Sequence, residues 1–330
     1  ICRNKRFKFI IFQMNNYKNL KKLKGDASFR KFYRKKNKIF SSILVYSKKE
    51  KYKNLLVYDA INKILIKNKV LAPKLLSEKY NRNYIEIQDF GNQRIFDVLR
   101  KSNDKFLYFK KIIKILNQIQ RIKDKNIKNF QDKKYRIPRY SKKMLLDETN
   151  LFCDWYLDKK LSKKNIASFR KRFDKIVKNL ILNLKFKNEV FVHRDFHVSN
   201  LMLVNKQIGV IDSQDAVIGN KAYDLASLID DVRLKTSIIL KKKIFNFYIQ
   251  KQNKLSVDKF KNDFEILSIL RNLKIIGIFT RLAKRDGKKN YSKLIPHAWY
   301  LIRVRINNNK VFKDLKYLLN ENFREELHEN

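Results

Sequence analysis

The stretch FVHRDFHVSNLMLVNKQIGVIDSQDA, residues 191–216, contains the spacing His-x-Asp-x-x-x-x-Asn, which is formed by His193, Asp195 and Asn200. Asp212 follows in the same stretch. Phosphoryl transfer from a nucleotide requires such a set, because one carboxylate lies beside the acceptor hydroxyl while an amide and a second carboxylate hold Mg²⁺. We therefore predict an ATP-dependent kinase site in which Asp195 is the base, with Asn200 and Asp212 as oxygen ligands of Mg²⁺.

Two apolar runs, residues 201–204 and 208–211, flank the polar residues 205–207. This pattern predicts two short strands joined by a turn. Such a hairpin would return the chain so that Asn200 and Asp212 come to the same end, close enough to share a metal ion.

The polar neighbours of this set have several open roles. His193, counted with the catalytic residues, is expected to hold the loop by hydrogen bonds and not to act on substrate. Arg194 and His197 can contact a phosphate or the substrate, and a loop-stabilising role is equally open. In GNKAYDLASLIDD, Asp224 is expected to cap a helix or to brace the catalytic loop through backbone donors.

The composition is that of a globular protein with a large positive charge. Of 330 residues 44% are hydrophobic, and 78 Lys+Arg against 31 Asp+Glu give a net charge of +47. Such a charge suggests nucleic acid or anionic membrane. The lysines, however, are spread along the whole chain beside abundant Asn, Ile, Phe and Tyr, as an AT-rich coding sequence would produce. We expect no specific nucleic-acid partner, only weak binding to polyanions at low salt.

Cysteine content and hydropathy bear on the compartment. Cys2 and Cys153 are too few for a disulfide framework or a zinc site. No apolar run approaches the length of a membrane span, and the opening ICRNKRFKFIIFQ is too short for a signal peptide. These features predict a cytoplasmic protein without a membrane partner.

The order of predicted elements indicates an α+β, bilobal, protein-kinase-like fold. Strand patterns are followed by long helical patterns, and the catalytic hairpin interrupts the latter. The expected strands are 28–34, 39–46, 73–80 and 84–90, with a helix near 50–67. The expected later helices are 105–121, 144–156, 163–184, 260–283 and 298–307.

These elements suggest a division of the chain into three parts. Residues 1–22 are expected to form an N-terminal extension. Residues 23–91 are expected to form a nucleotide-binding lobe with a small antiparallel sheet. Residues 92–330 are expected to form the catalytic and substrate-binding lobe.

Two segments of the first lobe are candidates for nucleotide binding. Gly25, Asp26 and Ser28 lie in a turn that would cover phosphates, although its single glycine makes it neither a Walker loop nor a full GxGxxG. The segment IQDFGN, which contains Gln88 and Phe90, falls where a connector between lobes would receive adenine. An ordinary strand end with a glycine turn is the alternative.

Together, HRDFHVSNLM, IGVIDSQDA, GNKAYDLASLIDDVR, GDASFRKFYR and LRNLKIIGIFTRLAKRDGKKNYSKLIP resemble the aminoglycoside phosphotransferase superfamily. More narrowly they resemble its bacterial branch of anomeric kinases for N-acetylmuramate and N-acetylglucosamine, over residues 23–304. The resemblance implies a protein-kinase-like fold, ATP, Mg²⁺ and transfer to the C1 hydroxyl of a sugar. It also implies peptidoglycan recycling, with a sugar-1-phosphate nucleotidyltransferase downstream.

Carried over by position, the resemblance gives Asp195 the role of base, and Asn200 and Asp212 that of metal ligands. Residues 25–34, ending in Arg34, would form the nucleotide loop and its strand.

The acceptor side follows from the same resemblance. Glu148 and Trp155, in DETNLFCDWY, match a segment near the sugar pocket. An aromatic face suits sugar C–H surfaces, but a core role for Trp155 is equally open. Arg194, His197 and Asp215 complete the candidate substrate-binding residues.

The sequence departs from this family at the strand SSILVYSKK. Many members carry a lysine in this strand that grips the α and β phosphates, and the strand here has none in its interior. Arg34, Lys48 or Lys49 can supply the cation. The following segment, Met-Asp-Ala-Pro-Pro in the sugar-kinase branch, reads VYSKK here.

Two other functions stay open. One is a kinase for another hydroxyl compound, such as an aminoglycoside or a choline-like alcohol, which would require carboxylates around a cationic acceptor. The other is a non-catalytic nucleotide- or RNA-binding protein that retains the fold. The intact set of Asp195, Asn200 and Asp212 disfavours the second, because a degraded site usually loses one of its members.

Overall fold

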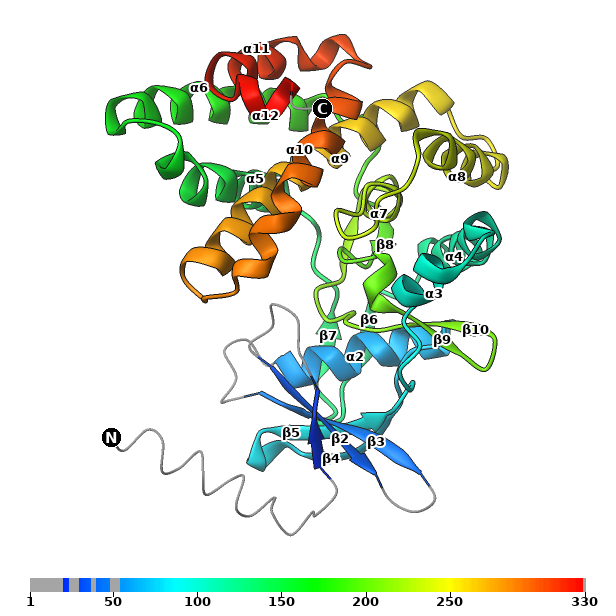
Figure 1. Ribbon diagram of the computed structural model, residues 1–330. Coiled ribbons are helices and arrows are strands. Elements are labelled where there is room, and N and C mark those ends of the chain that lie inside the picture. Colours follow the sequence, from blue (N-terminus) through cyan, green and yellow to red (C-terminus); the bar gives the residue numbers. More distant parts are fainter. Residues whose placement is uncertain (1–19, 24–29, 37–39, 48–53, 329–330) are drawn as a thin grey trace, which may run out of the picture.

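The structure is a computed structural model that describes residues 20–23, 30–36, 40–47 and 54–328. A small antiparallel sheet with one helix lies at one end, and a larger, mainly helical part lies at the other (Figure 1). This arrangement confirms the predicted α+β class and its two lobes.

The sheet has five strands in the order β1-β2-β3-β5-β4, all antiparallel. Its side chains alternate between faces, and one face of β3 and β5 packs on α2. The small core between them consists of Ile43, Val45, Leu55, Tyr58, Ile85 and Ile87. The elements of this lobe are β1 (Leu20–Lys22), β2 (Lys31–Lys36), β3 (Ser41–Tyr46), α2 (Asn54–Lys67), β4 (Leu75–Lys79) and β5 (Tyr84–Gln88).

The helical lobe contains every long helix that the sequence predicts, and α3, α8, α11 and α12 in addition. Four of its helices begin after a side chain that accepts a backbone N–H of the first turn, as capping residues do: Asp104, Ser141, Ser162 and Ser237. Its α-helices are α3 (Ile95–Lys101), α4 (Lys105–Gln120), α5 (Lys142–Trp155), α6 (Lys163–Leu182), α7 (Tyr223–Ile229), α8 (Ile238–Gln250), α9 (Val257–Lys284), α10 (Ile295–Ile306), α11 (Lys313–Asn322) and α12 (Arg324–His328). Short 3-10 helices span Tyr80–Arg82, Leu157–Lys159, Val198–Asn200, Lys289–Leu294 and Lys310–Phe312.

Helix α9 is the centre of this lobe and is buried along most of its length. Gly277 allows α5 to approach it closely, because a Cβ at this position would collide with the backbone of Leu151. Three aromatic rings pack beside this crossing. The ring centroid of Phe152 on α5 lies 5.9 Å from that of Trp299 on α10 and 5.5 Å from that of Phe323, which lies between α11 and α12.

The predicted catalytic hairpin is present as β9 (Leu201–Val204) and β10 (Gln207–Val210). Asn205 and Lys206 both have positive φ, 47° and 66°, as a two-residue type I′ turn requires. A second pair of strands, β8 (Val190–Val192) and β11 (Val217–Gly219), holds the two ends of the catalytic region together.

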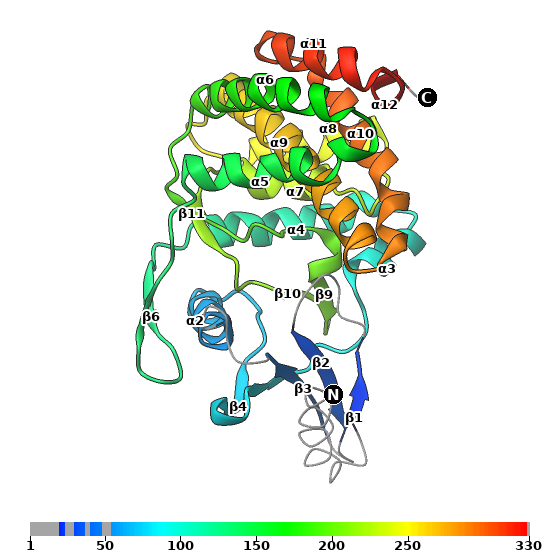
Figure 2. The ribbon, with the colours of Figure 1, turned by 90° about the vertical axis from the view of Figure 1, so that its left-hand side faces the viewer.

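A further hairpin extends from the helical lobe alongside α2 (Figure 2). It consists of β6 (Asn126–Lys128) and β7 (Lys134–Arg136). The ring of Phe130, at its tip, meets Tyr80 of the sheet lobe edge-on at 5.6 Å. Lys67 at the end of α2 also pairs with Asp124 at 3.0 Å. These contacts tie the lobes together at a point away from the connector.

Among the described residues, no helix combines the length and the apolar character needed to cross a lipid bilayer.

Candidate active site

The loop between β8 and β9 carries Asp195, and a buried carboxylate holds this loop in place. Asp224 accepts hydrogen bonds from the backbone N–H groups of His193 at 2.7 Å and Arg194 at 3.0 Å. Arg194 has φ of 73°, a left-handed conformation that costs free energy in a residue with a side chain. The two bonds to Asp224 therefore stabilise a strained turn beside Asp195, the candidate base. Asp224 lies inside the first turn of α7, whose N-cap is Ala222.

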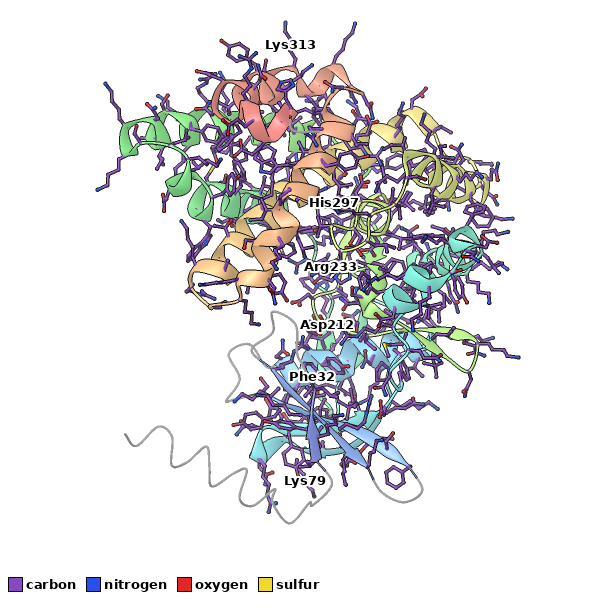
Figure 3. All side chains as sticks on the ribbon, viewed as in Figure 1. Phe32, Lys79, Asp212, Arg233, His297 and Lys313 are labelled. Atoms are coloured by element: carbon purple, nitrogen blue, oxygen red, sulfur yellow. The ribbon has the colours of Figure 1, made fainter. Side chains whose placement is uncertain are left out.

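The hairpin brings the two candidate metal ligands together. Val210 pairs with Leu201, and the N–H of Ile211 donates to the carbonyl of Asn200 at 3.0 Å, so Asp212 follows directly beside Asn200. The Asn200 Nδ2 donates to the carbonyl of Asp195 at 3.1 Å, which leaves its Oδ1 to face a ligand. Asp212 lies where the sheet lobe meets the helical lobe (Figure 3).

The donor set fits Mg²⁺. One carboxylate and one amide oxygen are the protein share of a site that Mg²⁺ completes with phosphate oxygens and water. The described residues contain no group of three or more His, Cys, Asp and Glu side chains that would form a cage made by the protein alone.

Positive charge surrounds Asp195. Burial by itself raises the pKa of this carboxyl, but the cations Lys274, Arg271 and Arg194 hold the pKa well below its ordinary value. The carboxylate is therefore ionised at neutral pH. Such a weak base suits a reaction in which the hydroxyl proton leaves late, when the acceptor oxygen already bonds to phosphorus.

Glu148 of α5 lies near Asp195 but is already neutralised. It pairs with Arg194, accepts from the Lys274 Nζ at 2.8 Å, and accepts from the hydroxyl of Tyr140. Burial raises its pKa, and Lys274 and Arg194 more than offset that effect. Glu148 is thus ionised and holds two cations, Arg194 and Lys274, near Asp195.

His197 and His193 are buried and uncharged at neutral pH. Burial and the charge of Arg233 lower the pKa of His197 to about 3, against the opposing charge of Asp231. Burial lowers the pKa of His193 as well, although Asp195 and Asp212 oppose it. Both uncharged rings therefore pack within the loop, and the hydrogen-bonding role expected for His193 stays a prediction.

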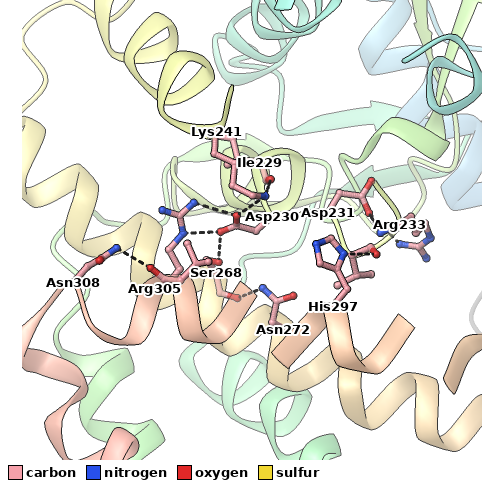
Figure 4. A network of polar contacts seen from close by, with 12 residues as sticks. Ile229, Asp230, Asp231, Arg233, Lys241, Ser268, Asn272, His297, Arg305 and Asn308 are labelled. Atoms are coloured by element: carbon pink, nitrogen blue, oxygen red, sulfur yellow. Dashed lines mark hydrogen bonds and ion pairs between the residues drawn. The ribbon is translucent and has the colours of Figure 1, made fainter. Parts of the chain in front are cut away.

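A buried ionic network fixes the segment that carries Asp231 and Arg233 (Figure 4). Asp230 accepts from Arg305 Nε at 2.9 Å, from Lys241 Nζ at 3.2 Å and from Ser268 at 2.6 Å. The pair of adjacent aspartates in an apolar run is the one sign of this network in the sequence.

Two predicted substrate residues lie further out. Trp155, the last residue of α5, is half-buried with its ring 5.9 Å from the guanidinium carbon of Arg285. Asp215 is exposed, and its carbonyl accepts from Arg194 Nη1 at 3.2 Å.

The phosphate role considered for Arg34 is corrected by its contacts. Its Nε pairs with Asp89 at 2.6 Å, its Nη2 donates to the carbonyl of Gly91 at 2.8 Å, and its Nη1 contacts Asn92. Arg34 therefore anchors the connector between the lobes and is not directed at Asp212.

The other residues expected to bind nucleotide stay predictions. The N–H of Gln88 donates to the carbonyl of Lys74 at 2.9 Å and is therefore engaged within the sheet lobe. Phe90 is buried and its ring packs against Gly209 of β10. The remaining predictions lie outside the described residues: Gly25, Asp26, Ser28, Lys48 and Lys49.

The structure adds two residues of the sheet lobe that the sequence interpretation missed. Arg30 pairs with Asp212, its Nη2 lying 2.7 Å from Oδ1. Asn62 of α2 accepts from the hydroxyl of Ser213 at 2.6 Å and donates to the carbonyl of Pro73 at 3.1 Å. The metal-ligand segment is thus tied to the sheet lobe on both sides of Asp212.

The candidate base and the candidate metal ligands lie on one loop and one hairpin, where a small sheet lobe meets a helical lobe. This arrangement is typical of a phosphotransferase. The chain belongs to the phosphotransferase enzyme family, whose model matches residues 19–255.

Three similar proteins illustrate the relationship. The N-acetylmuramate/N-acetylglucosamine kinase of Neisseria meningitidis serogroup B is 27% identical over 287 residues, 85% of this chain and 84% of that protein. The protein of the same name from Pseudomonas aeruginosa is 26% identical over 301 residues, 89% and 86% of the two chains. A choline/ethanolamine kinase family protein from Mesorhizobium loti has a similar fold, with a TM-score of 0.63 at 10% identity over 93% of this chain and 94% of that chain.

Proposed function

We propose that the chain is an ATP- and Mg²⁺-dependent kinase that phosphorylates the anomeric hydroxyl of N-acetylmuramate or N-acetylglucosamine. The observation that carries this proposal is the placement of Asp195, Asn200 and Asp212 on one loop and hairpin, held by Asp224. The names of the similar proteins from Neisseria and Pseudomonas support the choice of acceptor.

Each residue of the site has a distinct task in this reaction. Asp195 orients the acceptor hydroxyl and takes its proton late in the transfer. Asn200 and Asp212 would hold Mg²⁺, which supplies positive charge to the transferred phosphate. Asp224 keeps the loop in its strained conformation, so the base is in place before the substrate arrives.

The charges around the base favour a neutral or anionic acceptor over a cationic one. An aminoglycoside or a choline-like alcohol needs a carboxylate that is free to pair with its ammonium group. Glu148 is occupied by Lys274 and Arg194, and Arg271 adds a further positive charge near Asp195. The lactyl carboxylate of N-acetylmuramate suits this environment, whereas a cationic acceptor does not.

A product phosphorylated at C1 would serve a sugar-1-phosphate nucleotidyltransferase, in the cytoplasm where ATP is available. We propose no specific nucleic-acid partner, because the lysines are spread along the whole chain and do not form a single block.

A substrate panel read by phosphorus NMR tests this proposal. Purified protein with ATP and Mg²⁺ is expected to convert N-acetylmuramate or N-acetylglucosamine to the 1-phosphate, and to leave kanamycin and choline unmodified. Phosphate on a non-anomeric hydroxyl, or turnover of kanamycin or choline in place of the sugars, would contradict the assignment. No turnover of any acceptor, with retained nucleotide or RNA binding, would favour a non-catalytic function.

A further inference from the structure

A buried arginine of the sheet lobe reaches the candidate metal ligand of the helical lobe. Arg30 is 5% exposed, and its Nη2 lies 2.7 Å from Asp212 Oδ1, 182 residues away in the sequence. The guanidinium carbon lies 5.7 Å from the ring centroids of both Phe32 and Tyr58. Two aromatic faces next to a cation stabilise its position. The charge of Arg30 is therefore fixed beside Asp212 and does not belong to a loose surface side chain.

Three other cations among the described residues of this lobe have partners away from Asp212. Arg34 is bound to the connector through Asp89 and Gly91. Lys35 of β2 pairs with Glu86 at 3.3 Å, and Lys63 of α2 pairs with Asp59 at 2.8 Å. Strand β3 reads SSILVY and contains no cation.

The position of Arg30 in the sheet points to the nucleotide. Strands β1 and β2 are antiparallel, and the N–H of Leu23 donates to the carbonyl of Phe32 at 2.9 Å. Arg30 therefore lies at the end of the segment that connects these two strands. Because its guanidinium touches Asp212, Arg30 lies beside the candidate metal ligands, where the phosphates of a bound nucleotide would be.

We propose that Arg30 is the cation that binds the nucleotide phosphates in this chain, in place of a lysine on β3. This inference rests on the proposed ATP-dependent function. A guanidinium presents a planar fork of donors that matches phosphate oxygens in a bidentate manner. In the structure Arg30 pairs with Asp212. When a nucleotide binds, Arg30 exchanges the carboxylate oxygen for phosphate oxygens, and the carboxylate becomes available to the metal.

The test separates phosphate binding from general stability. Calorimetric titration of wild type, Arg30→Met and Lys35→Met with ADP and with adenosine, both with Mg²⁺, measures how much affinity the phosphates add. Arg30→Met is expected to weaken ADP binding by roughly 10- to 100-fold, the range for charge-assisted hydrogen bonds. The adenosine affinity of Arg30→Met should stay within about twofold of wild type. Lys35→Met removes a cation that pairs with Glu86, and its affinities for ADP and for adenosine should both resemble those of wild type.

The outcomes distinguish the possible explanations. An unchanged ratio of ADP to adenosine affinity in a folded Arg30→Met protein would overturn the assignment, and so would an equal loss for both ligands. If that variant does not fold, Arg30→Gln keeps a donor for Asp212 without the charge, and the same ratio decides. Wild-type protein that binds neither ligand would contradict the proposed function instead.

Discussion

The hydroxyl of Ser213 donates a hydrogen bond of 2.6 Å to Oδ1 of Asn62, and the two residues lie 151 positions apart in the sequence. Asn62 belongs to α2 of the sheet lobe, and Ser213 directly follows the candidate metal ligand Asp212. Both side chains are buried. This bond therefore fixes the position of the metal segment relative to the lobe that we propose to bind the nucleotide.

Ser213→Ala is expected to reduce both stability and catalysis. The buried Asn62 Oδ1 would lose its partner, which costs about 1–3 kcal/mol of unfolding free energy. A displaced Asp212 should also lower kcat, measured with saturating ATP. Asn62→Ala and the double variant complete a cycle. If the bond acts as described, the two single effects will not add; strictly additive losses would show that the residues act separately.

Gly277→Ala should be more harmful than its size suggests. The added methyl would collide with the backbone of Leu151 on α5, and that helix carries Glu148. Overpacking of this kind costs about 1–3 kcal/mol, which urea denaturation would measure. The displacement of α5 should lower kcat as well. The neighbouring change Ile278→Val, at a half-buried position, is the control. A Gly277→Ala protein with wild-type stability would show that the helices separate without cost.

Lys274→Met should affect the anionic acceptor most. Lys274 pairs with Glu148 at 2.8 Å and is the first of the charges that lower the pKa of Asp195. Its removal leaves Glu148 with Arg194 and makes the site less positive. We expect kcat/KM for N-acetylmuramate to fall by about tenfold more than kcat/KM for N-acetylglucosamine. A difference of this size corresponds to the loss of one partly buried pair of opposite charges. Lys259→Met, at an exposed position of the same helix, should change neither. Equal losses for the two sugars would contradict a role in acceptor charge selection.

The buried histidines should make the fold sensitive to mild acid. The pKa of His197 is lowered to about 3 by burial and Arg233, and the pKa values of His193 and His297 are lowered mainly by burial. Unfolded imidazoles take up protons near pH 6.5. The unfolded state therefore binds more protons below that pH, and the free energy of unfolding falls by up to about 1.4 kcal/mol per pH unit for each histidine.

Urea denaturation at pH 7.5 and pH 5.5 measures this effect. Burial raises the pKa of Asp224 to about 7, so protonation of this carboxyl stabilises the fold in the same pH range and offsets part of the histidine effect. The acid-induced loss of each variant is therefore compared with the loss of wild type. His197→Gln should reduce the acid-induced loss by about 1 kcal/mol. His328→Gln, at an exposed position, should leave the loss unchanged. The same loss in His197→Gln as in wild type would mean that His197 is not held neutral in the fold.

The sequence was informative where the structure depends on local pattern. Two apolar runs on either side of a polar break predicted β9 and β10, and with them the approach of Asn200 and Asp212. The helical periodicity predicted α4, α5, α6, α9 and α10 to within a few residues at most ends.

The residues that were missed have partners far away in the chain. Arg30 is one of many cations in a lysine-rich sequence, and only its contact with Asp212, 182 residues later, distinguishes it. Lys274 lies in a largely apolar helix, and its role follows from its hydrogen bond to Glu148, 126 residues earlier. Arg34 matched the expected position of a phosphate ligand, but Asp89 and Asn92 hold it at the connector. No periodicity or spacing encodes such pairings.

The central claim is that Asp195 is the base of a phosphoryl transfer to a sugar hydroxyl. Asp195→Asn keeps the size of the side chain and removes its charge, so the most direct measurement is kcat of this variant with ATP, Mg²⁺ and N-acetylmuramate, beside its affinity for ADP. We predict a fall in kcat of roughly 10²- to 10⁴-fold with ADP affinity close to that of wild type. Turnover at the wild-type rate would contradict the account and place the base elsewhere.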